Sequence, residues 1–164
     1  MATLVTVETS ERERLLWNRY NAVLTTVPGM IDERMRAATG LSRFQFTLLE
    51  TIERNPAGQV QLADVARATD SSLSRLSHAI TRLERAGLVE RRTCDEDRRA
   101  SWAVLTPVGA KAVADARERY ASVMREVLLD RIPDDQHDAA ITLLTALLPT
   151  DVRGACDVID GVNP

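Results

Sequence analysis

The sequence predicts a mainly α-helical fold of the α+β class, in which one short β-hairpin stands among amphipathic helices. Apolar residues return every three or four positions through most of the 164-residue chain, as they do along one face of a helix. Two runs between residues 88 and 106 are instead rich in strand-forming residues and are separated by a charged loop. Aromatic residues are 4% of the composition and glycines number seven, which suits a helical protein.

The first predicted element is a long helix from Ser10 or Glu11 to about Thr39, after a loose lead-in. Because proline removes a backbone hydrogen bond and clashes with the preceding turn, we expect Pro28 to kink or break this helix near Val27. The apolar residues at steps of three and four are Leu16, Tyr20, Val23, Leu24, Val27, Ile31 and Met35.

The second helix begins at a capping box, with Ser42 as N-cap and Gln45 three residues later, and Leu41 and Phe46 are spaced as a hydrophobic staple. Its pattern stops at the Asn-Pro-Ala-Gly run of residues 55–58. Residues 59–61 are long enough only for a short third strand against the hairpin. A helix over 62–69 then leads into a turn at 70–72.

The helix after that turn has an apolar and a polar face. Asp70, Ser71 and Ser72 are N-cap residues ahead of it, and Gly87 is placed to end it in a left-handed conformation. The apolar face carries Leu73, Leu76, Ile80 and Leu83, followed by Leu88; the polar face carries Ser74, Arg75, Ser77, His78, Thr81, Arg82 and Arg85. Such side chains can donate to base edges and phosphates, and a helix fits the DNA major groove. The alternative is an ordinary amphipathic helix with a solvated polar face.

The hairpin strands are expected at residues 88–93 and 101–106, and the loop between them carries Arg98 and Arg99. A hairpin with arginines at its tip, directly after a polar-faced helix, suits a wing that reaches into the minor groove. Residues 41–106 are therefore predicted to form a winged helix-turn-helix domain with a two- or three-stranded wing.

Two further helices follow the hairpin. Thr106 and Pro107 are the N-cap and first residue of a helix to about Arg131, and the last helix spans about residues 135–148 before Pro149 stops it. Residues 149–164 form a tail. The apolar residues of the first of these helices are Val113, Ala116, Tyr120, Val123, Val127 and Leu128, and those of the second are Ala140, Ile141, Leu144, Leu147 and Leu148.

The winged segment carries a family motif. It is Ser74-x-Leu76-Ser77-x-x-Ile80-x-Arg82-Leu83-Glu84-x-x-Gly87-Leu88-Val89-x-Arg91, followed by Asp97-x-Arg99 and by Leu105-Thr106-x-x-Gly109. With this motif, the chain resembles the MarR family of bacterial transcription regulators over about residues 10–148. The resemblance implies a homodimeric, DNA-binding repressor, less often an activator, that small phenolic or other aromatic ligands release from DNA.

The resemblance also implies structural roles for other parts of the chain. It implies that residues 1–40 and 107–148 form dimerisation helices around the winged domain, and that Asp97 is the carboxylate that pairs with a wing arginine, most simply Arg99. A ligand site is implied between the dimer helices and the winged domain, where Trp17, Tyr20 and Phe44 are available, although these aromatics equally suit a plain core. Many family members have arginine where this chain has His78, which leaves the base read at that step open.

The expected partner is a pseudo-palindromic operator of double-stranded DNA. Arg75 is the predicted guanine reader, because its guanidinium fork matches O6 and N7. The residues expected to contact base edges are Ser74, Arg75, Ser77 and His78. Those expected to contact DNA phosphates are Ser71, Ser72 and Arg82, and those expected to enter the minor groove are Arg98 and Arg99.

The formal net charge is −3, but the charges are unevenly distributed. Residues 71–99 hold seven arginines against five carboxylates and form a locally positive block, whereas residues 100–164 carry a net −4. The acidic remainder motivates an alternative of another class, in which the winged fold is a protein-interaction module without its own operator.

Other functions are disfavoured by what the sequence lacks. His78 and His137 are the only histidines and lie far apart, so no metal site is expected, and no nucleophile motif or phosphate-cradling glycine loop suggests an enzyme or a cofactor. Cys94 and Cys156 cannot form a disulfide framework in a cytoplasmic protein, and acidic neighbours oppose the activation of Cys94 as a redox sensor. The sequence has no apolar stretch of about 18 residues and no leader pattern, so we expect a cytoplasmic protein without a membrane partner.

Overall fold

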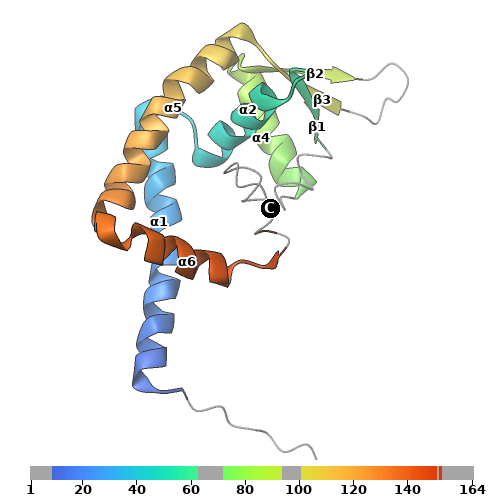
Figure 1. Cartoon of the computed structure of the whole chain (residues 1–164). Helices are drawn as coiled ribbons and strands as arrows, with labels where there is room; N and C mark the ends of the chain where they lie inside the picture. The colour runs from blue at the N-terminus through green and yellow to red at the C-terminus, as the bar shows by residue number, and fades with distance from the viewer. Residues whose placement is uncertain (1–8, 63–71, 94–100, 151, 153–164) are drawn as a thin grey trace, which may run out of the picture. The chain divides into compact units, whose positions relative to one another are not determined.

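A computed structural model describes residues 9–62, 72–93, 101–150 and 152 (Figure 1). They form helices and one three-stranded antiparallel sheet, as the sequence predicts. The chain divides into two units, Met1–Val127 and Leu128–Pro164, and each is described by itself. Several predicted features lie outside the described residues: most of the helix over 62–69, Ser71, the wing loop with Cys94, Asp97, Arg98 and Arg99, and Cys156 in the tail.

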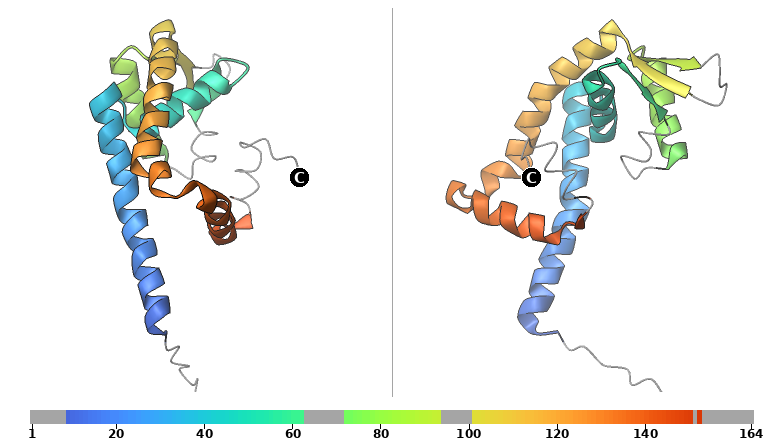
Figure 2. Two further views of the ribbon diagram at one scale, coloured as in Figure 1. Left: turned by 60° about the vertical axis from the view of Figure 1, so that its left-hand side comes forward. Right: turned by 45° about the vertical axis from the view of Figure 1, so that its right-hand side comes forward.

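Helix α1 (Glu11–Thr39) starts from a capping box between Ser10 and Glu13. It runs through Pro28 without ending, so the break expected near Val27 does not occur. Proline leaves the carbonyl of Leu24 without its helical donor, but this stretch of α1 is largely exposed and water can satisfy the oxygen. In both views of Figure 2 the first half of α1 extends past the rest of the first unit. Only Ile31 and Met35 of α1 are buried.

Helix α2 (Arg43–Arg54) begins at the predicted capping box. The Ser42 hydroxyl accepts from the Gln45 N–H at 3.1 Å, and the Gln45 side chain accepts from the Ser42 N–H at 2.9 Å. Leu41 and Phe46, the predicted staple, are both buried. The local pattern therefore fixes this helix start, as expected.

Helix α4 (Leu73–Arg85) follows the segment outside the described residues. Ser72 is its N-cap, and the Ser72 hydroxyl accepts from the Arg75 N–H at 3.2 Å. The predicted apolar face is confirmed for the side chains that are fully buried, which are Leu76, Ile80 and Leu83.

The end of α4 confirms the role predicted for Gly87, whose φ is +71°. Its N–H bonds to the carbonyl of Glu84 and the N–H of Leu88 bonds to the carbonyl of Leu83, both at 2.9 Å. These two bonds make a Schellman motif, which a residue with a side chain enters at a steric cost.

The sheet contains β1 (Gln59–Gln61), β2 (Val89–Thr93) and β3 (Ser101–Leu105) in the order β1-β3-β2. All pairs are antiparallel, and Ala103 of the central strand is paired with Val60 on one side and Arg91 on the other. The short third strand predicted at residues 59–61 is confirmed.

Helix α5 (Pro107–Val127) lies beside α1 in every view (Figures 1 and 2). Its buried residues Val113, Ala116, Val123 and Val127 complete the core, and Tyr120 meets Phe46 of α2 with ring centroids 5.0 Å apart. Arg117 forms ion pairs with Glu50 and Glu53 of α2, and its hydrogen bond to Glu53 raises the pKa of Arg117.

Thr106 joins α4, β2 and α5. Its hydroxyl donates to the Gly87 carbonyl at 2.7 Å and accepts from the Gly109 N–H at 3.0 Å, and its own N–H bonds to the Leu88 carbonyl at 3.1 Å. A Cβ atom on Gly109 would lie 2.0 Å from the Leu88 carbonyl oxygen, so only glycine fits there. The Leu-Thr-x-x-Gly motif is thus a packing junction.

The second unit contains two short 3₁₀ turns, η1 (Leu129–Arg131) and η2 (Asp134–Gln136), and helix α6 (His137–Leu147). The sequence predicts that α5 continues to Arg131; it ends instead at Val127, because Leu128 leaves the helical region at φ −131° and ψ −60°. Within the described residues, no helix combines the length and apolarity needed to span a bilayer.

Candidate nucleic-acid interface

The polar surface of α4, which the sequence treats as one face, is divided by the structure into three rows. The outward row contains Ser74, His78 and Arg85, all exposed or partly exposed. Among the residues that the structure describes, none of these three side chains has a hydrogen bond or ion pair. The outward row is therefore free to contact another molecule, and it carries no carboxylate.

The second row faces strand β2 and is already occupied. Arg91 of β2 donates from Nη2 to the Ser77 carbonyl at 3.1 Å, the Ser77 hydroxyl at 3.4 Å and the Thr81 hydroxyl at 2.9 Å. Its Nε lies 3.5 Å from a carboxylate oxygen of Glu84. This arginine fixes α4 against the sheet and forms an ion pair with Glu84.

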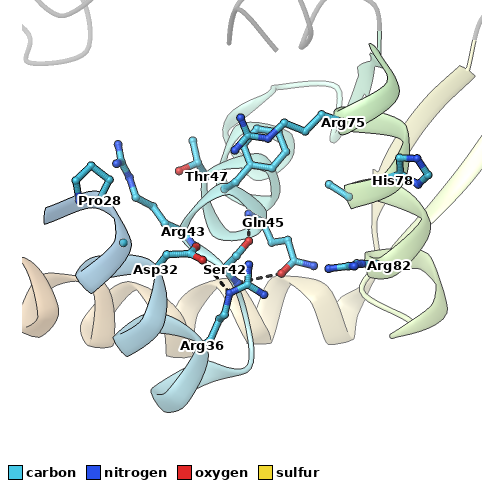
Figure 3. A pocket seen from close by; sticks show the side chains of 13 residues that line it. Pro28, Asp32, Arg36, Ser42, Arg43, Gln45, Thr47, Arg75, His78 and Arg82 are labelled. Atoms are coloured by element: carbon cyan, nitrogen blue, oxygen red, sulfur yellow. Dashed lines mark hydrogen bonds and ion pairs between the residues drawn. The ribbon is translucent and has the colours of Figure 1, made fainter. Parts of the chain in front are cut away.

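The third row faces α1 and α2 across an open cavity of about 950 Å³. Arg75 and Arg82 extend from α4 toward the start of α2 (Figure 3). The guanidinium carbon of Arg75 lies 4.7 Å from the centre of the Phe44 ring, within the range of a cation–π contact. The charged residues around the cavity are Asp32, Arg36, Arg43, Arg75 and Arg82, and His78 also borders it.

Asp32 is the one carboxylate that lines this cavity among the described residues. It accepts from the backbone N–H of Arg43 at 2.9 Å and from Nε of Arg36 at 2.8 Å, which connects α1 to the first turn of α2. Partial burial acts to raise the pKa of Asp32, but the hydrogen bonds from Arg36 and Arg43 and the nearby charges of Arg36 and Arg75 outweigh it, and the pKa lies below its ordinary value.

The residues predicted to contact base edges are therefore distributed over all three rows. Ser74 and His78 lie on the outward row, and in Figure 3 the His78 ring points away from the cavity. Ser77 contacts Arg91, and Arg75 stacks on Phe44.

The structure describes only some of the residues that are predicted to contact DNA phosphates and the minor groove. Ser72 caps α4, and Arg82 borders the cavity. Ser71, Asp97, Arg98 and Arg99 lie outside the described residues.

Of the aromatics considered for a ligand site, only Phe44 lines the cavity. Trp17 and Tyr20 lie on the exposed first half of α1, with ring centroids 5.9 Å apart. Sequence reasoning missed Arg36 and Arg43 as cavity residues, although Arg36 lies one helical turn after Asp32, a spacing typical of an ion pair. It also left Arg85 out of the predicted contact residues.

Comparison with known proteins gives a consistent result. A sequence model described as MarR family matches residues 39–100. The curated protein YfiV of Bacillus subtilis, named as an uncharacterized HTH-type transcriptional regulator, is 32% identical over 98 residues. The match covers 59% of this chain and 59% of that relative.

The solved structures with a similar fold include two from Streptomyces coelicolor. AbsC, a MarR family transcriptional regulator, is 25% identical with a TM-score of 0.74, over 95% of this chain and 99% of its own. Sco3205, a MarR family transcriptional regulator in complex with DNA, is 24% identical with a TM-score of 0.75, over 88% of this chain and 96% of its own. A mutant MarR of E. coli complexed with operator DNA is 19% identical with a TM-score of 0.67, over 86% of this chain and all of its own. These structures confirm the predicted winged helix-turn-helix fold.

Proposed function

We propose that this chain is a MarR-family transcription regulator, which binds operator DNA as a homodimer and represses transcription in the cytoplasm until a small ligand releases it. The observation that carries the proposal is the outward row of α4, where Ser74, His78 and Arg85 stand beside the capped start of the helix without a partner among the described residues.

DNA contact is supported by the chemistry of that row. In the proposal, Ser74 and His78 contact base edges from the first turns of α4, and Arg85 holds a phosphate. Arg75 reaches a base after leaving Phe44, while Ser71, Ser72 and Arg82 contact phosphates and Arg98 and Arg99 enter the minor groove beside Asp97. Relatives of the same fold have been solved with DNA, which supports this docking mode.

Homodimer formation is supported by apolar surface on helices outside the winged domain. On α1, Leu16, Trp17 and Leu24 are between 51% and 65% exposed, on a helix that contributes Ile31 and Met35 to the core. Helix α6 likewise exposes Ile141, Leu143, Leu144 and Leu147. A monomer rarely leaves such clusters in water. A second copy that covers them would present two α4 helices to the two half-sites of a pseudo-palindrome.

The effector is proposed to be a small aromatic or phenolic ligand, as the family resemblance implies. The cavity between α1, α2 and α4 is the candidate site, because one wall is α4 itself and its volume of about 950 Å³ is in the range of small-molecule sites.

A footprint on the intergenic DNA beside the gene tests the proposal. We expect two protected half-sites about 10 bp apart. Arg85→Ala should weaken binding to this DNA and to random DNA alike, whereas His78→Ala should reduce binding to the operator about tenfold and leave random DNA little affected. Arg75→Ala should also weaken operator binding more than random binding; equal losses would remove Arg75 as a base reader.

The alternative function, a protein-interaction module, makes the opposite prediction. No protection and no gel shift at low salt, from a protein that is folded and dimeric, would favour it. Gel filtration with light scattering supplies the second measurement, and Leu16→Glu with Leu24→Glu should yield a monomer if the proposed dimer surface is correct.

A further inference from the structure

We infer that the cavity between α1, α2 and α4 binds a small organic molecule with at least two negatively charged groups, and that this ligand competes directly with DNA for Arg75 and Arg82. The inference rests on the proposed function. It specifies the charge of the ligand and the way in which the ligand releases DNA.

The first step is the charge of the cavity. Four guanidinium groups border it, from Arg36, Arg43, Arg75 and Arg82, against the single carboxylate of Asp32 among the described residues. Asp32 is shared between Arg36 and the backbone of Arg43. Among the residues that the structure describes, the side chains of Arg43 and Arg82 have no carboxylate partner. A ligand with one negative charge would leave most of this excess uncompensated, whereas two or more anionic groups can each bind a guanidinium fork.

The second step is the position of the aromatic ring. Phe44 is the one aromatic side chain of the described residues that lines the cavity, and the Arg75 guanidinium lies over its face at 4.7 Å. A flat, weakly charged ligand would have to displace Arg75 to stack on Phe44, with the loss of that cation–π contact. An anionic group can instead bind the exposed edge of the guanidinium while the contact is kept.

The third step is that two cavity residues belong to α4, the helix that is proposed to contact DNA bases. Arg75 and Arg82 both extend from α4 toward α2, on the side away from the His78 ring (Figure 3). A guanidinium group that is paired with a ligand anion inside the cavity cannot also bind a base or a phosphate of the duplex. The ligand and the duplex therefore compete for the same two side chains.

The test uses the full-length protein and inorganic pyrophosphate in magnesium-free buffer, with benzoate as a ring-bearing monoanion at matched ionic strength. By isothermal titration calorimetry we expect pyrophosphate to bind at least about tenfold more tightly than benzoate. Arg43→Gln should weaken pyrophosphate binding about tenfold, and Asp32→Asn, which removes the opposing charge, should strengthen it. Arg119→Gln removes an exposed arginine from α5 and should leave the affinity within about twofold of the wild type.

A DNA competition assay gives the second readout. Pyrophosphate should raise the apparent Kd of the wild type for its operator about fivefold over sodium chloride of equal ionic strength, and this shift should shrink to under about twofold in Arg43→Gln. The unfolding midpoint of each variant, measured without ligand, identifies any variant that is misfolded, and in that case Arg36→Gln replaces Arg43→Gln.

Three results would overturn the inference. Benzoate that binds as tightly as pyrophosphate would show that the ring rather than the charge is recognised. Equal pyrophosphate affinity in Arg43→Gln, Asp32→Asn and the wild type would place the anion elsewhere. A loss of DNA affinity in Arg43→Gln, without pyrophosphate, as large as that of Arg85→Ala would assign Arg43 to the duplex rather than to the ligand. Failure of the proposed function is separate, because a protein that binds no DNA can still be titrated with pyrophosphate.

Discussion

The two flanks of helix α4 hold arginine side chains in opposite ways. On the flank toward β2, Arg91 is surrounded by Ser77, Thr81 and Glu84, and its hydrogen bonds tie the helix to the sheet. On the flank toward α1 and α2, Arg75 and Arg82 border an open cavity. The first flank uses arginine to fix the helix, and the second keeps arginine available for a partner. Changes on the first flank should therefore reduce stability, and changes on the second should mainly alter binding.

The largest loss of stability should come from Arg91→Ala. The side chain is 30% exposed, and its removal leaves the Ser77 carbonyl, the Thr81 hydroxyl and the Glu84 carboxylate without their cation. We expect the free energy of unfolding to fall by about 2 kcal/mol, measured by urea denaturation. Arg92→Ala is the matched control, because Arg92 is 61% exposed and pairs loosely with Glu90. A loss as large in Arg92→Ala would mean that general charge, rather than the contacts of Arg91, is responsible.

A smaller loss, about 1 kcal/mol, is expected for Thr81→Val, because its hydroxyl both donates to the Ser77 carbonyl at 2.8 Å and accepts from Arg91 at 2.9 Å. Thr51→Val is the control: Thr51 makes the same bond to its own helix, with Thr47, but meets no arginine among the described residues. Chemical denaturation of both variants should separate the contribution of the threonine's bond to its own helix from the contribution of the bond that Arg91 donates. If Thr51→Val costs as much as Thr81→Val, the bond from Arg91 contributes nothing to this flank.

On the cavity flank, Arg75→Ala should lower the free energy of unfolding by only about 0.5 kcal/mol, the value of an exposed cation–π contact. The comparison with Arg91→Ala is informative, because each variant removes one arginine from one flank of α4. Thermal and urea unfolding should both show a smaller loss of stability for Arg75→Ala than for Arg91→Ala. A cost for Arg75→Ala equal to that of Arg91→Ala would remove the distinction between the two flanks.

The smallest effect concerns the cavity carboxylate and depends on pH. Because the pKa of Asp32 is lowered in the folded protein, its ionised form stabilises the fold at pH values above the ordinary value of about 4, and this contribution disappears as the pH falls through the lowered pKa. Asp32→Asn should thus be less stable than the wild type near about pH 6, and the difference should shrink below about pH 4. Asp115→Asn, in the exposed pair with Lys111, is the surface control for the same titration. A constant difference across this range would exclude ionisation as its cause.

Local features of the fold were predictable from sequence because each depends on neighbours within one turn of chain. The Ser42–Gln45 capping box, the Thr106 cap and the left-handed Gly87 belong to this group, and all three are present. The end of α5 was misplaced, because the apolar pattern continues through Leu128 while the backbone does not.

The division of α4 into three rows was not predictable, because it depends on partners that are distant in sequence. Arg91 reaches Ser77 across fourteen positions, and Arg75 meets Phe44 only because α2 and α4 line the same cavity. Periodicity identifies which side chains leave the core, but it does not distinguish those that reach solvent from those that meet another element.

The junction at Thr106 has a mechanical consequence. One hydroxyl group is bonded to both the Gly87 carbonyl, just after α4, and the Gly109 N–H, in the first turn of α5, where no larger residue than glycine can be accommodated. The Thr106 hydroxyl therefore couples the C-terminal end of α4 directly to the first turn of α5. A tilt of α5 should therefore move the C-terminal end of α4 with it.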